Sequence, residues 1–369
     1  MTDNRATTLS NNVSSLFALT SQLMMSKAVN RPAAKQTLVP VPAGLQLFQT
    51  SVLVLGAVGV VANGLVCVLL AQMQSKKRAS TNLLILNQLA LDLYTCAILV
   101  VLGSLYLHPV SMSGLGGKLL CKLFNNQLLV WIGLVGSVTG IVAITLERYV
   151  KIVFPMLHKK YFRQWMIYVS VVCCWLNGIL MEGPSIWVKS DLVQGHCIQV
   201  QTIHDHSSQV VYGVFKFTWK FLLPFSVLVV CYAHILIVVR KSAKVHGTGV
   251  ASGNTARASD VRIQMNIIKT MITITIFFFI SWLPSQVCFF LVDIEYIKSS
   301  SSSFYVVWFS AMLLTFINIC GNPFIYATQY DVMKARLKSI AARFASTQVI
   351  QTVAVPLGHD IATVSVRSL

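Results

Sequence analysis

The chain has 369 residues, of which 55% are hydrophobic and only 11% are charged. Soluble domains carry roughly 25% charged residues, so this composition excludes an ordinary water-soluble protein. The formal net charge of +18 would suit nucleic acid, but the basic residues lie in short segments between long apolar runs. That distribution is typical of loops beside acidic lipid headgroups, and we expect no nucleic-acid partner.

Long stretches without Asp, Glu, Lys or Arg mark the candidate membrane spans. A helix needs about 20 mainly apolar residues to cross roughly 30 Å of hydrocarbon. The segments that meet this need are 47–72, 83–107, 119–150, 164–187, 211–239, 264–292 and 304–328. Because backbone groups in lipid must be satisfied internally, each segment is predicted to be a helix. The sequence therefore predicts an all-α membrane protein built as a bundle of seven transmembrane helices.

Basic residues set the expected orientation of this bundle. The segments at 76–78, 151–163 and 240–262 fall on the same side as the C-terminal tail. With Arg148 and Lys269 at helix ends included, that side holds 19 of the 29 Lys and Arg residues. The positive-inside rule makes that side cytoplasmic and places the N-terminus outside, as in a multi-pass protein of the plasma membrane.

The two ends of the chain differ from the bundle of residues 45–328. Residues 1–44 are polar and form an expected extracellular tail, in which Asn12 begins a glycosylation sequon, Asn12-Val13-Ser14. No signal peptide is evident, so the first helix is expected to direct insertion. Residues 329–344 are predicted to form a short interfacial helix, and residues 345–369 a cytoplasmic tail.

The predicted interfacial helix depends on an amphipathic pattern after the last span. Met333, Leu337, Ile340 and Phe344 share one face at helical spacing, with Lys and Arg residues among them. This pattern is typical of a helix that lies in the inner membrane interface. An ordinary solvated basic helix is the alternative.

The nine cysteines fall into two groups. Seven lie inside apolar spans and are interpreted as buried thiols. Cys121 opens the third helix and Cys197 lies in the second outer loop, and both are on the expected extracellular side, where disulfides persist. A bridge between them would tie that loop to the top of the third helix.

Polar residues, prolines and tryptophans recur inside the spans, and polar residues are costly there. In helix order the markers are Asn63; Asn87 and Asp92; Glu147-Arg148-Tyr149; Trp175 and Pro184; Pro224 and Tyr232; Phe278, Trp282 and Pro284; and Asn318 with Asn322-Pro323 and Tyr326. One marker alone is weak, but a set in all seven helices, in this order, resembles the rhodopsin-like (class A) G-protein-coupled receptors. The resemblance covers about residues 45–344.

The resemblance implies a sodium site in the middle of the bundle. Asp92 corresponds to its carboxylate, with Ser137, Asn318 and Asn322 as expected neighbours. Sodium would be an allosteric modulator; no cofactor and no other metal are expected. The alternative is an Asp92 that burial keeps neutral.

The resemblance also implies an activation switch at the cytoplasmic ends of the helices. Glu147 would hold Arg148 at rest, and Tyr149 completes that motif. Tyr232 and Tyr326 would receive Arg148 when the sixth helix swings out. The residues expected to link ligand contact to that swing are Phe278, Trp282, Pro284, Asn322 and Pro323. A heterotrimeric G protein is the expected partner there, with arrestin as a second; a merely packed Phe278–Trp282 pair is the alternative.

One spacing departs from the family pattern. Arg148 follows Cys121 by 27 residues, about two more than is usual. Either the third helix is irregular near its outer end, or the outer loop pairs differently.

The cavity residues exclude some ligands and suggest others. Residues 123–146 contain no acid to bind an amine, and 304–328 contain no Lys for retinal. Lys216 and Lys220 are four apart on one predicted face of the fifth helix, near Glu182, and form a candidate site for an anion. Further candidate ligand residues are Gln127, Trp131, Trp219, Gln286, Phe289 and Trp308. The alternatives are that a lysine snorkels or pairs with Glu182, and that the aromatic residues only pack.

Taken together, these patterns predict a receptor that binds an extracellular ligand and activates a G protein. A peptide is the first choice of ligand, and a small organic acid or lipid is the second. A transporter or channel is disfavoured because no inverted repeat is visible. An enzyme is not expected, because no nucleophile–base or metal-ligand cluster is apparent.

Overall fold

The computed structural model describes most of the bundle but little of the two ends. The described residues are 43–72, 80–193, 195–199, 205–247, 255–294, 296–297 and 302–329, with residues 334, 338, 339 and 342. Asn12, the apolar face of the expected interfacial helix and the tail 345–369 lie outside them.

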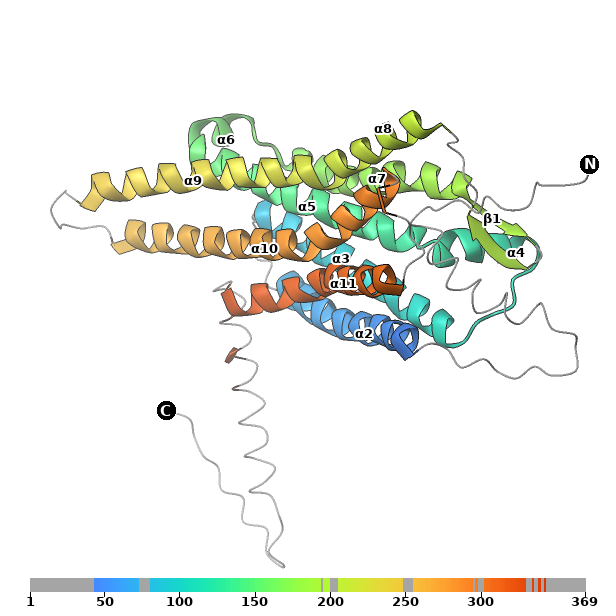
Figure 1. Cartoon of the computed structure of the whole chain (residues 1–369). Helices are drawn as coiled ribbons and strands as arrows, with labels where there is room; N and C mark the ends of the chain where they lie inside the picture. The colour runs from blue at the N-terminus through green and yellow to red at the C-terminus, as the bar shows by residue number, and fades with distance from the viewer. Residues whose placement is uncertain are drawn as a thin grey trace, which may run out of the picture.

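The described chain forms a bundle with seven membrane-spanning segments, as expected (Figure 1). Five of these segments are single helices: α2 (Ala43–Gln72), α3 (Ser80–Leu107), α7 (Gln164–Lys189), α10 (Thr255–Asp293) and α11 (Ser302–Gln329). The third span is made of α4 (Gly114–Leu120), η1 (Cys121–Asn125) and α5 (Leu128–Val153). The fifth is made of α8 (His206–Phe217), η2 (Thr218–Leu222) and α9 (Leu223–Gly247), and α6 (Pro155–Tyr161) is a short connecting helix.

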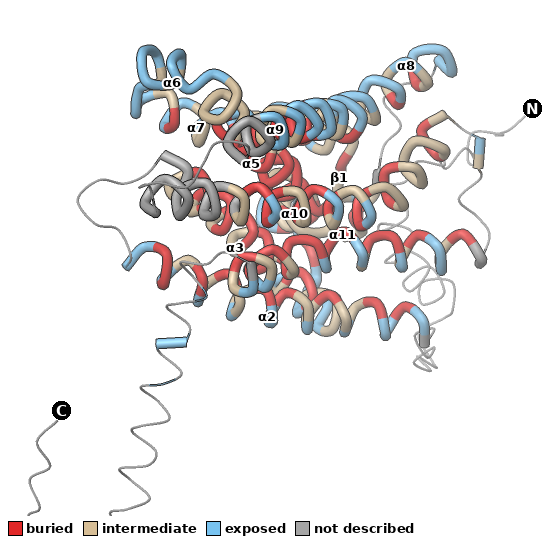
Figure 2. Tube along the Cα trace, turned by 90° about the vertical axis from the view of Figure 1, so that its left-hand side faces the viewer, coloured by how far each residue is buried: buried red, intermediate tan, exposed pale blue. Residues whose placement is uncertain are grey.

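The distribution of exposed side chains is that of a protein in lipid. Large apolar side chains cover the outside: Val61 is 71% exposed, Leu180 67% and Val230 65%. Buried residues gather where the helices face one another, as Figure 2 shows. Asn63 and Asp92 are both fully buried in that interior. This arrangement suits a bilayer, in which the outer surface needs no polar groups and polar groups inside need partners.

The third span is irregular near its outer end, which is the first of the two alternatives that the long spacing left open. The η1 segment is a π-helical turn, in which the amide of Asn126 donates to the carbonyl of Cys121 at 2.9 Å. Gln127 follows with φ of 59°, the left-handed region that costs about 1–2 kcal/mol for a residue with a Cβ. A π turn and a left-handed residue lengthen the chain without lengthening the helix, so they accommodate the two additional residues.

A two-stranded hairpin covers one end of the bundle, which we call the disulfide end. Strands β1 (Ser190–Val193) and β2 (His196–Gln199) pair antiparallel, with Gly195 at φ of 78° in the turn. The disulfide between Cys121 and Cys197 is present, with Cα atoms 5.3 Å apart. The expected bridge is therefore confirmed in spite of the unusual spacing, because the irregular η1 turn brings Cys121 to the hairpin.

Candidate ligand cavity and activation switch

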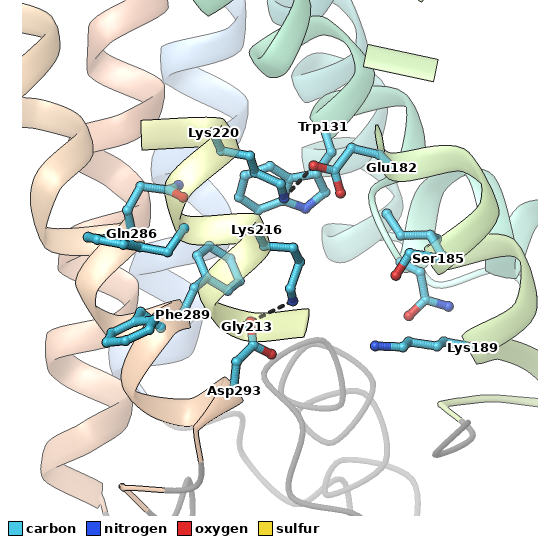
Figure 3. Close-up of a pocket in the computed structure, with 14 residues that line it drawn as sticks. Trp131, Glu182, Ser185, Lys189, Gly213, Lys216, Lys220, Gln286, Phe289 and Asp293 are labelled. Carbon is cyan, nitrogen blue, oxygen red and sulfur yellow. Dashed lines mark ion pairs between the residues drawn. The ribbon is translucent and has the colours of Figure 1, made fainter. Parts of the chain in front are cut away.

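Two ion pairs join three spans inside a cavity at the disulfide end (Figure 3). Lys216 on α8 lies 2.5 Å from a carboxylate oxygen of Asp293, the last residue of α10. Lys220 in η2 forms an ion pair with Glu182 of α7, and its ammonium also lies 5.3 Å from the ring centre of Trp131. The alternative in which a lysine pairs with Glu182 is therefore the one that the structure shows.

The two lysines contact different neighbouring helices. Four residues apart on a regular helix, they would share a face and repel one another. The π-helical turn η2 begins after Phe217 and contains Lys220, so the regular spacing is lost between them. As a result Lys216 faces α10 while Lys220 faces α7.

A third lysine, which the sequence did not single out, completes the charge of the cavity. Lys189 is the last residue of α7 and has no ion-pair partner among the described residues. Its ammonium and that of Lys216 each lie 4.7 Å from the ring centre of Tyr212. The cavity lining thus holds three lysines and two carboxylates, Glu182 and Asp293, and has an excess of one positive charge.

Aromatic rings form the other wall of the cavity. Trp131 and Phe289 pack edge to face at 5.1 Å between ring centres, and Phe289 packs edge to face on Trp308 at 4.4 Å. Gln286 lines the cavity with a buried Nε2 that has no hydrogen-bond partner in the described part of the chain. Trp308 lies behind Phe289 and does not reach the lining, although its buried Nε1 also has no partner there.

Besides Trp308, two further residues expected to line the cavity lie elsewhere. Gln127 points toward α3, where its Nε2 donates to the hydroxyl of Tyr106 at 3.0 Å. Its neighbour Asn126 is in the lining instead, because the left-handed turn rotates the chain at this point. Trp219 is 41% exposed and donates to Asn177 on α7, so it lies outside the lining as well.

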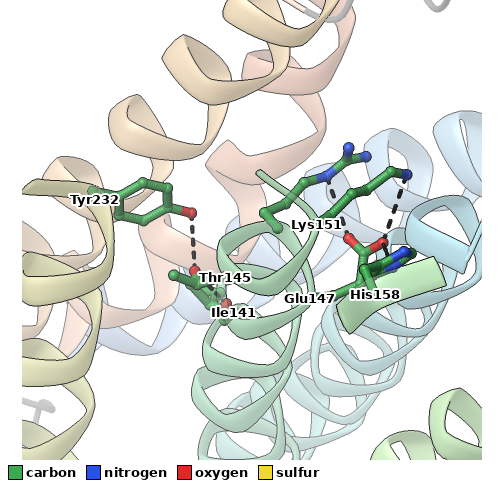
Figure 4. Close-up of polar contacts among 7 residues, drawn as sticks. Ile141, Thr145, Glu147, Lys151, His158 and Tyr232 are labelled. Atoms are coloured by element: carbon green, nitrogen blue, oxygen red, sulfur yellow. Dashed lines mark hydrogen bonds and ion pairs between the residues drawn. The ribbon is translucent and has the colours of Figure 1, made fainter. Parts of the chain in front are cut away.

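At the opposite end of the bundle, Glu147 faces three basic side chains (Figure 4). One oxygen lies 3.4 Å from Nε of Arg148, and the other lies 3.8 Å from both Lys151 Nζ and His158 Nε2. Burial lowers the pKa of His158 below its ordinary value; the nearby Glu147 opposes this effect, and the cationic neighbours add to it. A neutral His158 leaves Arg148 and Lys151 as the counter-charges of Glu147.

The two tyrosines expected to receive Arg148 are both buried near this end. The hydroxyl of Tyr232 shares a hydrogen bond of 2.9 Å with Thr145 of α5, one turn before Arg148 (Figure 4). Tyr149 has a different partner, the ring nitrogen Nδ1 of His234 at 3.0 Å. Arg148 is thus paired with Glu147 in this arrangement, while Tyr232 is bound to Thr145.

The sixth span carries the aromatic pair and the proline that the sequence singled out. The rings of Phe278 and Trp282 lie 5.3 Å apart, and both are almost fully buried. Pro284 lies inside α10, where a proline removes one ladder hydrogen bond and bends a helix. Next to it, Thr315 of α11 shares a hydrogen bond of 2.8 Å with Ser285. Pro323 lies inside α11, close to the buried Asn322.

The carboxylate of Asp92 lies in a ring of neutral donors. Ser137 Oγ donates to it at 2.7 Å, and Asn322 Nδ2 donates at 2.8 Å. Gln88, one turn earlier on α3, places its Nε2 at 3.3 and 3.4 Å from the two carboxylate oxygens. Asn318 is buried, but its Nδ2 has no partner among the described residues. A sodium ion needs oxygen ligands, whereas here the amide N–H groups of Gln88 and Asn322 face the carboxylate, so the residues as they are arranged do not fit the sodium ion that the resemblance implies.

The comparisons with known proteins agree with this architecture. Residues 62–326 match the model of the seven-transmembrane receptors of the rhodopsin family. The human galanin receptor type 1 is 25% identical over 80% of this chain and 82% of its own. The human neuropeptide Y receptor type 4-2 is 23% identical over 77% of this chain and 76% of its own. The lysophosphatidic acid receptor 1-B of Xenopus laevis is 27% identical over 58% of this chain and 55% of its own.

The family match spans most of the bundle, and it includes Arg148, Pro284 and Asn322-Pro323. The chain therefore belongs to the rhodopsin family of seven-transmembrane receptors, multi-pass proteins of the plasma membrane that bind a ligand and signal through G proteins.

Proposed function

We propose that this receptor binds a peptide that presents a carboxylate to the cavity at the disulfide end. The observation that carries the proposal is the excess positive charge of the cavity, where Lys189 has no ion-pair partner in the described chain. A cation in a partly buried cavity favours an anion, and a charge-assisted hydrogen bond to it is strong. The carboxylate would lie between Lys189 and Lys216, the two ammonium groups beside Tyr212.

The proposed orientation places the disulfide end outside the cell and the Arg148 end in the cytoplasm. Disulfides persist outside the cell, which suits the end that carries Cys121–Cys197. Lys151, Lys159, Lys160 and Arg163 lie at the other end, around the connecting helix α6. A basic loop of this kind favours the cytoplasmic side.

A peptide is favoured over a lipid because the cavity combines charge with several polar groups. Ser185 and Gln286 line it beside the lysines and the aromatic wall, which offers contacts for a ligand with both kinds of group. The relatives named for neuropeptide Y and galanin match over more of this chain than the one named for lysophosphatidic acid. A small organic acid or lipid is the second candidate, favoured by the packed rings of Trp131 and Phe289.

The proposed mechanism begins with an exchange of partners at Lys216. The ligand carboxylate takes the place of Asp293, so the ion pair that fastens the end of α10 to α8 is lost. The freed helix moves about the bend at Pro284, and its other end swings outward. Arg148 then leaves Glu147 for Tyr232 and Tyr326, which opens the surface that a G protein enters.

Replacing Lys189 by Gln is expected to weaken a peptide agonist with a free carboxylate about ten- to a hundredfold. The factor corresponds to a lost charge-assisted hydrogen bond of about 1.5–3 kcal/mol. Agonists would be found by screening peptides with free and with amidated C-termini, lipids and small acids, with nucleotide exchange on several G proteins as the readout. Lys118→Gln is the matched control, because Lys118 is exposed on α4 at the same end.

Two outcomes would contradict this proposal. If only lipids activate the receptor, the second candidate replaces the peptide. If a free carboxylate and its amide are equally potent on the unaltered receptor, the lysines hold no ligand anion.

Asp293→Asn is expected to raise agonist-independent nucleotide exchange several-fold. The substitution removes the charge that Lys216 binds and loosens the end of α10 without any ligand. Asp191→Asn, which removes a carboxylate from strand β1, is the control and should leave exchange unchanged. Unchanged basal exchange in Asp293→Asn, at equal surface expression, would show that this ion pair does not restrain α10.

A further inference from the structure

We infer that the amide of Gln88 takes the place of a cation beside Asp92, so that this receptor is insensitive to sodium. The Nε2 of Gln88 is nearly equidistant from the two carboxylate oxygens, at 3.3 and 3.4 Å. It also lies 2.5 Å from Ser137 Oγ, which itself donates to Asp92. A cation bound by Asp92 and Ser137 would need the position that this nitrogen fills.

With Asp92 ionised, the hydrogen-bond network favours one orientation of the amide. If the amide were reversed, its oxygen would face two carboxylate oxygens, and acceptors that close repel one another. Ser137 could not relieve the repulsion, because its proton is already donated to Asp92 at 2.7 Å. With Nε2 toward Asp92, the carboxylate accepts from Gln88, Ser137 and Asn322, and its lone pairs are satisfied by neutral donors.

A glycine on the neighbouring helix makes room for this side chain. A methyl group on Gly140 of α5 would overlap Oε1 of Gln88, while the nearest atom of another residue, Leu91 Cδ1, would be 3.8 Å away. Apart from Gln88, the space beside Gly140 would therefore admit a methyl group. The side chain of Gln88 thus occupies the space that the missing side chain of Gly140 leaves, and this fit keeps its amide against Asp92.

Four residues of this hydrogen-bonded cluster join three spans without any ion. Gln88 and Asp92 lie on α3, Ser137 on α5 and Asn322 on α11, and all four are buried. A bound cation would stabilise such a cluster only when the ion is present, whereas a tethered amide does so at every sodium concentration. The receptor's stability should therefore be the same in sodium and in a larger organic cation.

The experiment measures thermal unfolding of the purified receptor in NaCl and in choline chloride, at about 0.15 M ionic strength. For the unaltered chain, equal midpoints are expected in the two salts. Gln88→Leu removes the amide and leaves Asp92 and Ser137 in place, so sodium should raise its midpoint by a few degrees over choline. Adding Asp92→Asn to that variant should abolish the difference, because the carboxylate is gone.

A second variant tests the same inference while every polar group is kept. Gly140→Ala should push Gln88 aside, lower the midpoint in choline and introduce a sodium response. In a Gln88→Ala background, Gly140→Ala should cost little, because the overlapping atom is absent. Asn87→Ala is the matched control, because it removes the adjacent buried amide, which accepts a hydrogen bond from Trp175 and does not contact Asp92. This variant should show no sodium response.

The inference would be overturned if sodium, relative to choline, raised the unfolding midpoint of the unaltered receptor as much as that of Gln88→Leu. The lack of any sodium response in both Gln88→Leu and Gly140→Ala would also overturn it. None of these measurements depends on the ligand or on nucleotide exchange.

Discussion

Glu147→Gln should raise agonist-independent nucleotide exchange about tenfold, and adding Arg148→Ala should abolish that exchange. Glu147 holds Arg148 at 3.4 Å, and both side chains are buried, so the pair is poorly screened by solvent. Loss of the carboxylate frees the guanidinium for the tyrosines. A change of about 1.4 kcal/mol in the balance between the two arrangements is tenfold in their ratio.

The controls separate the switch from a general loss of charge. Lys151→Gln removes another cation that faces Glu147, 3.8 Å away, and should leave Arg148-dependent exchange in place. Arg148→Ala alone should keep surface expression and ligand binding but not exchange, measured with purified G protein. Normal exchange in the Arg148→Ala variant would show that this residue is not the switch.

Cys121→Ser and Cys197→Ser should each reduce delivery to the cell surface severely, and the double variant should be no worse than either. The bridge joins residues 76 positions apart, which is worth about 4 kcal/mol in the chain-entropy model. That figure is a large part of the stability of a typical folded protein. Cys173→Ser, a free and exposed cysteine on α7, is the control.

Surface labelling of intact cells, normalised to total receptor, measures this effect. Losses that add up in the double variant would contradict the pairing, since two partners share one bond. Equal delivery of Cys121→Ser and Cys173→Ser would show that the bridge is dispensable.

The bundle could be predicted because membrane spans depend on length and hydropathy, which are local properties. The spacing between Cys121 and Arg148 also pointed to one of two outcomes, an irregular third span or a different pairing of the outer loop, and the first is the one present. The form of that irregularity could not be predicted. The π turn and the left-handed Gln127 are accompanied by contacts with Tyr106 and the hairpin, and these partners are remote in sequence.

The lining of the cavity could be predicted only in part, for a physical reason. The face of a helix on which a residue lies can be predicted only while the helix is regular. That regularity is lost at η2, between Lys216 and Lys220. Asp293 and Lys189 lie at the ends of their spans, where charged residues are common, so the sequence alone does not mark them as cavity residues. Gln88 could have been found, because it lies one turn before Asp92 on the same face of α3.

The break at Gln127 bears on how force travels through the receptor. The regular helix of the third span is interrupted between Asn126 and Leu128, where Gln127 has a left-handed φ. We expect a displacement of the hairpin, applied through Cys121, to reach Arg148 less directly across this interruption. By contrast, α10 is one continuous helix from Thr255 to Asp293, although Pro284 removes one of its ladder hydrogen bonds. In the proposed mechanism, the sixth span rather than the third therefore carries movement from the cavity to the Arg148 end.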